Sequence, residues 1–140
     1  MTPRVERAAE LHAEGHNCSQ AVACVCAEDL GCDHATLFAV TEGLGRGMGD
    51  MGGTCGALSG ACVALGMACG TGDPARPTSK AATYRVCSRA RERFAELAGS
   101  TCCRDLKGVD TGVPLCSCRR CVEIGAQVVD ELLPEARGWR

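Results

Sequence analysis

Aromatic residues are scarce in this chain, whose 140 residues include one Trp, one Tyr and two Phe. A core without large rings has to be built from Ala, Leu, Val and Cys. Small side chains let helices pack closely, whereas strands are enriched in aromatic and β-branched residues. The scarcity of aromatics therefore favours a helical fold.

A strong net charge is also absent, because the formal charge is −2. No basic surplus is available to attract a phosphate backbone or an anionic lipid surface, so we expect no nucleic acid and no membrane as partners. The longest apolar run, 57–68, is too short to span a bilayer and is interrupted by glycine. The chain opens on a charged helical pattern rather than a signal peptide, so we expect a cytoplasmic protein.

Cysteine, by contrast, is abundant, with 13 residues. They are Cys18, Cys24, Cys26, Cys32, Cys55, Cys62, Cys69, Cys87, Cys102, Cys103, Cys116, Cys118 and Cys121. Cytosolic thiols stay reduced, so this number indicates metal binding or catalysis rather than a disulfide framework. The cysteines inside helical patterns are interpreted as small buried apolar residues.

Helical periodicity dominates the chain and predicts one all-α domain over 1–140, a compact bundle of five to six helices. The patterns cover 3–14, 17–30, 33–40, 55–69, 78–98 and 117–134, with a short helix at 102–106. We expect Pro134 to end the last helix.

A glycine-rich loop over 43–53 leads into the predicted helix 55–69, with Thr54 as its N-cap. Gly56 and Gly60 stand four residues apart, a spacing that lets two helix backbones approach closely, so we place this helix at the centre. Cys55 then falls in the first turn, where free N–H groups and the helix dipole favour a thiolate. We expect this loop to bring backbone N–H groups close to an anionic sulfur site.

Four cysteines follow a capping residue: Asn17-Cys18, Thr54-Cys55, Thr101-Cys102 and Ser117-Cys118. Cys103 shares a helix start with Cys102. If these four helix N-termini converge, they form a site of four thiolates surrounded by N–H donors, which suits an anionic iron–sulfur cluster. Capping residues are common before helices, so the convergence is a hypothesis.

Three further motifs carry less weight. Cys118 and Cys121 form a CxxC at a helix start, which is typical of a low-pKa thiol or a pair of metal ligands. Residues 47–52 match GxGxxG, but no strand precedes them, so we expect no nucleotide. The three histidines, His12, His16 and His34, are scattered and are interpreted as surface residues, although His16 is near Cys18 in sequence.

The chain resembles the C_GCAxxG_C_C family of small bacterial and archaeal redox proteins over nearly its whole length. The matching segments are 15–22, 45–49, 54–61, 103–106 and Cys118 with Val122 and Ala126. The resemblance implies a site of Cys18, Cys55, Cys103 and Cys118, whereas the capping pattern selects Cys102 as the third member. Cys121 is a further alternate ligand, and we expect Gly53 and Gly56 to lie against the cofactor.

The resemblance also bears on the cofactor, because a similar domain in split-Soret cytochromes is associated with an iron–sulfur centre. This chain has no Cys-x-x-Cys-His motif, so haem is not implied. Our first hypothesis is an iron–sulfur protein that carries or senses electrons with a redox partner protein. The alternatives are a thiol–disulfide oxidoreductase, in which Cys55 acts with Cys118, Cys121 or Cys103, and a zinc or copper(I) binding module. A homodimer remains an option.

Overall fold

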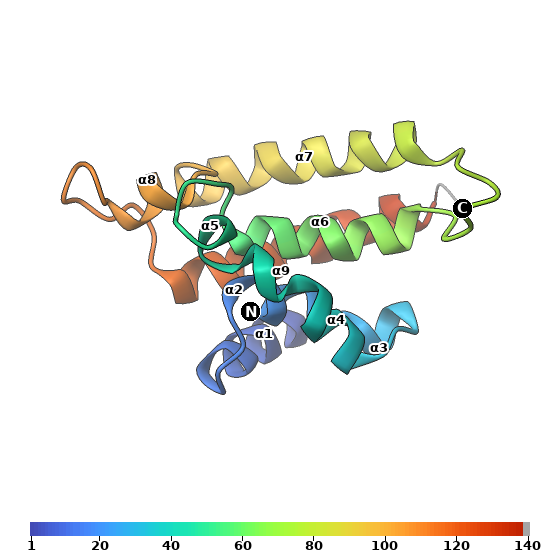
Figure 1. The fold of residues 1–140 in the computed structure, drawn as a ribbon, viewed down its shortest axis with the longest axis horizontal. Helices are drawn as coiled ribbons and strands as arrows, with labels where there is room; N and C mark the ends of the chain where they lie inside the picture. Colours follow the sequence, from blue (N-terminus) through green and yellow to red (C-terminus); the bar gives the residue numbers. More distant parts are fainter. Residues whose placement is uncertain (139–140) are drawn as a thin grey trace.

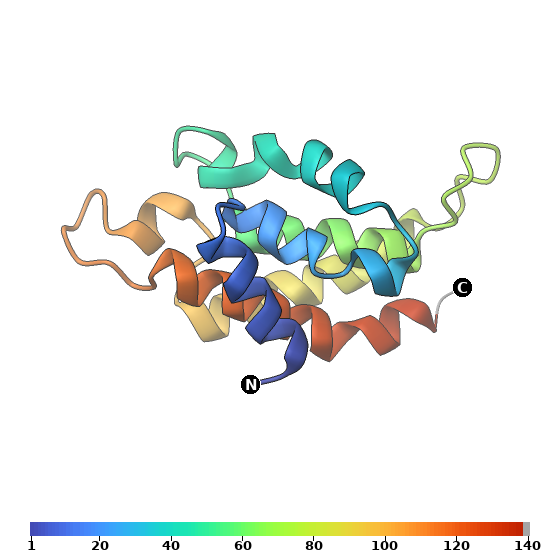
Figure 2. The ribbon, with the colours of Figure 1, turned by 90° about the horizontal axis from the view of Figure 1, so that it is seen from below.

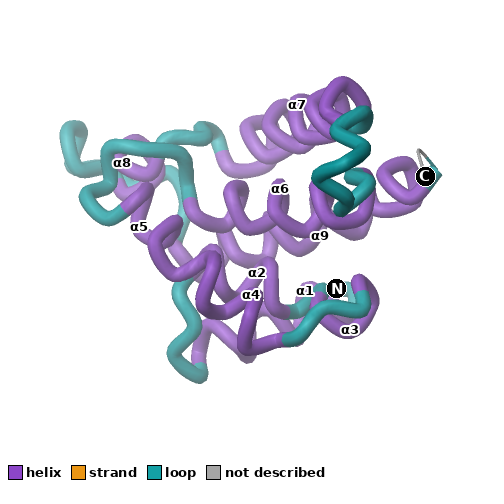
Figure 3. The backbone as a smooth tube through the Cα atoms, turned by 45° about the vertical axis from the view of Figure 1, so that its right-hand side comes forward, coloured by secondary structure: helices purple, strands orange, loops and turns teal. Residues whose placement is uncertain are grey.

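The computed structural model describes residues 1–138, which form helices and no β-strand. The helices are α1 (Pro3–Ala13), α2 (Cys18–Cys24), α3 (Ala27–Leu30), α4 (His34–Thr41), a 3₁₀ turn η1 (Glu42–Leu44), α5 (Gly45–Met48), α6 (Gly56–Cys69), α7 (Lys80–Ala98), α8 (Cys103–Lys107) and α9 (Cys118–Arg137). Figure 3 shows these helices joined by loops throughout. The all-α prediction is confirmed, and the six helices of seven residues or more make up the bundle.

Helix α6 is the centre of the bundle, with α7 on one side, α2 on the other and α9 along its length (Figures 1 and 2). A methyl group added at Gly60 would lie 2.5 Å from the Ser19 carbonyl oxygen of α2, and one added at Gly125 of α9 would lie 2.7 Å from the Ala57 carbonyl oxygen. Only glycine permits these two backbone approaches. The predicted central position of this helix is therefore confirmed.

Among residues 1–138, Phe94 of α7 is the one fully buried aromatic ring of the core. Around it the buried side chains are mostly Ala, Val, Leu and Cys, as the composition predicts. Among residues 1–138, no helix combines the length and the apolar character that crossing a membrane requires.

Two predicted helix boundaries are wrong. The segment expected as one helix over 17–30 is divided into α2 and α3 at Val25 and Cys26, although no glycine or proline marks the break. Helix α9 continues through Pro134 to Arg137. A proline near the C-terminus of a helix removes one N–H donor, and the packing of the preceding 16 residues outweighs this loss.

The glycine-rich segment is more ordered than the loop that the sequence predicts. It forms η1 and α5 and then a turn that leads into α6. Arg46, Gly47 and Met48 lie within α5 and have φ of 55°, 59° and 65°, so α5 is a left-handed turn rather than a regular α-helix. Two non-glycine residues in a left-handed run store strain, which is typical of a functional site.

Candidate metal centre

The first turns of α2, α6, α8 and α9 meet at one end of the bundle, beside α5 (Figure 1). They enclose a pocket of about 190 Å³. Six cysteines line this pocket: Cys18, Cys55, Cys103, Cys116, Cys118 and Cys121. We call it the cysteine pocket. The helix N-termini that the capping pattern singles out therefore do converge.

Cys18 and Cys118 each occupy the first position of a helix. The Asn17 side chain accepts a hydrogen bond from the Gln20 N–H at 2.9 Å, and the Gln20 side chain accepts one from the Asn17 N–H at 3.0 Å. Ser117 accepts from the Arg120 N–H at 3.1 Å. Both predicted caps are confirmed, and they orient the two helix starts toward the cysteine pocket.

Cys55 is placed differently from the prediction, because Cys55 itself, not Thr54, is the N-cap residue of α6. Thr54 forms a β-bridge with Cys102, and the Cys55 N–H donates to the Thr101 carbonyl at 2.8 Å. No side-chain hydrogen bond caps α6, and the Leu58 N–H donates to the Cys55 carbonyl at 3.0 Å. The N–H groups of Ala57 and Leu58 at this helix start lower the pKa of Cys55 and so favour its thiolate.

At the third cysteine the two sequence arguments disagree, and the geometry favours Cys103. Cys103 is 4% exposed and lines the cysteine pocket, whereas Cys102 is half-buried and is not among the described residues that line it. The predicted cap at Thr101 is wrong, because Cys102 is the N-cap of α8 and no side chain caps this helix. The Cys103 N–H donates to the Gly53 carbonyl at 3.1 Å, which ties α8 to the glycine-rich segment.

The left-handed turn explains why the glycine-rich segment is needed. The backbone N–H of Arg46 opposes the rise in the pKa of the Cys18 thiol, so this turn favours a thiolate there. A methyl group added at Gly47 would lie 2.6 Å from Cβ of Cys103. Successive backbone N–H groups in such a turn form a concavity that suits an anion.

The two glycines predicted to contact a cofactor have different positions. Gly56 lines the cysteine pocket, and a methyl group there would lie under 3.0 Å from the Cys18 sulfur. Gly53 is not among the described lining residues, and its carbonyl positions Cys103. Gly53 therefore affects the pocket indirectly, through the position of Cys103.

The thiols of the cysteine pocket differ in acidity. Burial raises the pKa of Cys18 and of Cys103, and each neighbouring thiolate adds to the effect because Cys18, Cys55, Cys103 and Cys118 interact electrostatically. Cys55 is the exception. Its pKa falls to about 7, chiefly because the Cys121 thiol donates a hydrogen bond to its sulfur and also because of the N–H donors and Lys107.

Three lining residues have no counterpart in the sequence prediction. Cys116 hydrogen-bonds Cys121, and its N–H donates to the Leu106 carbonyl at 3.2 Å, which holds this loop residue against α8. Lys107 lowers the pKa of Cys55 and opposes the rise at Cys103. His12, interpreted as a surface residue, also lines the pocket. In the sequence, only its position two residues before Cys118 indicates that Cys116 belongs to the pocket.

The fold and the pocket define a class, an all-helical protein with a cysteine-lined pocket at converging helix N-termini. The family described as "Putative redox-active protein (C_GCAxxG_C_C)" matches residues 16–132, and the chain belongs to this family. No curated protein and no solved structure matches the chain.

Proposed function

We propose that this protein binds an iron–sulfur cluster through Cys18, Cys55, Cys103 and Cys118 and carries or senses electrons. The observation that supports the proposal most directly is the convergence of four cysteines, each from the start of a different helix, on one pocket. Four thiolates are the usual ligand set of such clusters, and the cluster supplies one-electron redox chemistry when bound.

The size of the pocket favours a cluster over a single ion. Its volume of about 190 Å³ is well above the roughly 10–15 Å³ of space that one water molecule needs. A zinc or copper ion held directly by four thiolates needs much less room, since metal–sulfur bonds are about 2.3 Å long.

The polar surroundings also suit an anionic group. Backbone N–H groups of Arg46 and Ser19 oppose the rise in the pKa of Cys18, and those of Ala57 and Leu58 lower the pKa of Cys55. Hydrogen bonds to sulfur and the degree of solvent exposure set the potential of a cluster. With Lys107 adding a positive charge, the chain offsets part of the cost of gathering thiolates in a partly buried site.

The test is anaerobic reconstitution with iron and sulfide, followed by measurement of iron, acid-labile sulfide and the visible spectrum. We expect wild type and Cys102→Ser to retain the cluster, and Cys18→Ser or Cys103→Ser to lose most of it. Cys102 is the matched control for Cys103, because the two residues are adjacent and only Cys103 is among the described residues that line the pocket. Equal iron content in Cys102→Ser and Cys103→Ser would overturn the proposal, and so would a reconstituted wild type that binds no iron.

A second candidate function, thiol–disulfide exchange, is favoured by the Cys55–Cys121 hydrogen bond and by the pKa of about 7 at Cys55. In that reaction the Cys55 thiolate attacks a substrate disulfide and forms a mixed disulfide. Cys121, after losing its proton, then attacks the Cys55 sulfur and releases the reduced substrate. Two electrons pass to the substrate, and a Cys55–Cys121 disulfide remains.

The same variants separate the two functions. Exchange chemistry requires Cys55 and Cys121 and tolerates Cys18→Ser, whereas cluster binding requires Cys18. Reduction of a model disulfide by metal-free wild type, retained in Cys18→Ser and lost in Cys55→Ser, would support exchange.

A further inference from the structure

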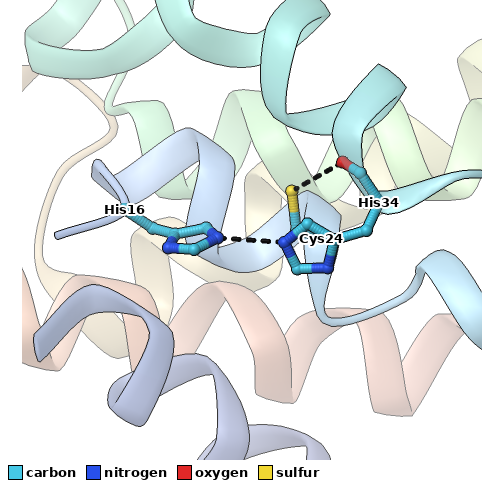
Figure 4. A group of neighbouring side chains, drawn as sticks. All are labelled: His16, Cys24 and His34. Atoms are coloured by element: carbon cyan, nitrogen blue, oxygen red, sulfur yellow. Dashed lines mark hydrogen bonds between the residues drawn. The ribbon is translucent and has the colours of Figure 1, made fainter. Parts of the chain in front are cut away.

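A second group of metal-ligating side chains lies outside the cysteine pocket. It consists of His16 from the α1–α2 connection, Cys24 at the end of α2 and His34 at the start of α4 (Figure 4). One ligand atom from each lies within 4.8 Å of the other two. The group joins three segments that are separated by up to 18 residues in the sequence, so only the tertiary fold creates it.

The rings of the two histidines meet at their Nε2 atoms, which are 3.0 Å apart. In a tetrahedral zinc site with Zn–N bonds of about 2.0–2.1 Å, two such nitrogens stand roughly 3.3 Å apart, and nitrogen and sulfur roughly 3.6 Å apart. The ligand atoms are thus within about 1 Å of the required spacing. His34 is exposed, so rotation of its side chain supplies the adjustment without moving the core.

The first histidine is held in place by its surroundings. Its ring packs edge-on against Phe38, with centroids 5.0 Å apart, and its backbone N–H donates to the Leu11 carbonyl at 3.1 Å. The Gln20 side chain donates to the Phe38 carbonyl at 3.0 Å and so fixes α4 against α2.

The nearby charges also favour a cation. Arg7 is the neighbouring positive charge, and it is paired with Glu10 at 2.9 Å and with Glu14 at 3.2 Å. Cys24 and His34 face a surface hollow whose charged lining residues are Glu28, Asp33 and the paired Arg7. A ligand bound at the cluster would therefore have one side open to solvent.

We propose that His16, Cys24 and His34 bind a zinc-class divalent metal ion through two imidazoles and one thiolate. The fourth coordination position faces the hollow and is filled by water, as in zinc sites with three protein ligands. Binding releases the thiol proton of Cys24 to solvent, and both imidazoles coordinate in their neutral form. The site is separate from the cysteine pocket, whose described lining includes none of the three ligands.

The experiment is an anaerobic titration with Co²⁺, which reports its ligands through its visible spectrum. It uses the chain with Cys55→Ser and Cys118→Ser together, which removes two of the four proposed cluster ligands; any Co²⁺ held by the remaining pocket cysteines is recognised because it does not respond to changes at His34. We expect one equivalent of Co²⁺ to bind, with the ligand-field bands of a four-coordinate site and a thiolate-to-metal charge-transfer band.

The added variants identify the ligands. His34→Ala, at an exposed position, should weaken binding by more than about 100-fold, the upper range for loss of an outer-shell partner. Cys24→Ser should remove the charge-transfer band, and Cys69→Ser, at a buried cysteine that belongs to neither site, should leave binding unchanged. Equal affinity of His34→Ala and its parent, or no Co²⁺ bound by a folded parent, would overturn the proposal.

A second arm covers the case in which the double variant does not fold. Wild type is first reconstituted with iron and sulfide, and Co²⁺ is then added. One further equivalent that His34→Ala lacks would support the site, and its absence in wild type would contradict it. The quantity compared is the Co²⁺ bound by wild type and by His34→Ala. The comparison therefore remains valid even if the protein binds no iron–sulfur cluster.

Discussion

The substitution Gly56→Ala tests whether the helix start of α6 and the cysteine pocket are one unit. A methyl group at this position would lie under 3.0 Å from the Cys18 sulfur and 3.0 Å from the Leu44 carbonyl oxygen. Ordinary contact begins near 3.4 Å, so the sulfur has to retreat by about 1 Å or α6 has to move. Metal ligands tolerate displacements of about 0.2 Å, so we expect the variant to lose most of its iron.

The same clash also lowers stability. Overpacking costs about 1–3 kcal/mol, which for a domain of this size lowers Tm by roughly 3–12 °C. Gly66→Ala on the same helix is the matched control, because its new methyl group would meet only Thr83 Cγ2 at 3.8 Å. Since alanine is favoured over glycine inside a helix by about 1 kcal/mol, the control should melt about 3 °C higher and retain all its iron.

The assay combines iron and sulfide analysis of the folded, reconstituted proteins with thermal melting followed by circular dichroism. The iron content is expressed per folded molecule, so that instability alone does not mimic loss of the site. Full iron content and an unchanged visible spectrum in Gly56→Ala would refute the reasoning, because the glycine would then be dispensable for the position of Cys18.

Two further predictions follow from the contacts of α6 and of Cys55. Gly60→Ala should lower Tm, because its methyl group would lie 2.5 Å from the Ser19 carbonyl oxygen, and the gain in helix propensity of about 1 kcal/mol does not offset this clash. A Tm equal to that of Gly66→Ala would contradict the close approach of α6 to α2. In metal-free protein, alkylation of Cys55 followed by peptide mass spectrometry should be half-maximal near pH 7, because the lowered pKa preserves the thiolate until the pH falls through about 7. Cys121→Ala should shift that midpoint toward the value of a free thiol, about 8.5, since the thiol that donates to the Cys55 sulfur is lost; an unmoved midpoint would exclude this cause.

The sequence by itself determined the all-α fold class and the central position of α6. Few aromatics and the small-residue spacing of Gly56 and Gly60 were sufficient, because close helix packing depends on side-chain size that is readable in the chain. The caps at Asn17 and Ser117 were also readable, since a capping side chain bonds within its own first turn.

Only the tertiary structure decided which sulfurs lie together. The start of α6 depends on the bridge between Thr54 and Cys102, a contact across 48 residues that turns Thr54 away from the capping role it has locally. That same bridge and the Gly53–Cys103 hydrogen bond orient α8, so they select Cys103 over Cys102 for the pocket. A local pattern places both cysteines at one helix start and cannot distinguish them.

The cluster of His16, Cys24 and His34 depends on the tertiary structure even more than the cysteine pocket does. His16 and His34 carry no spacing signal, because a site built from a connection and two separate helices has no fixed period in the chain. Periodicity reports which face of a helix is apolar, and a cap reports where a helix begins. Which helix ends meet is decided by the packing of α2, α4, α6 and α9, because the distances between them depend on contacts that no single segment contains.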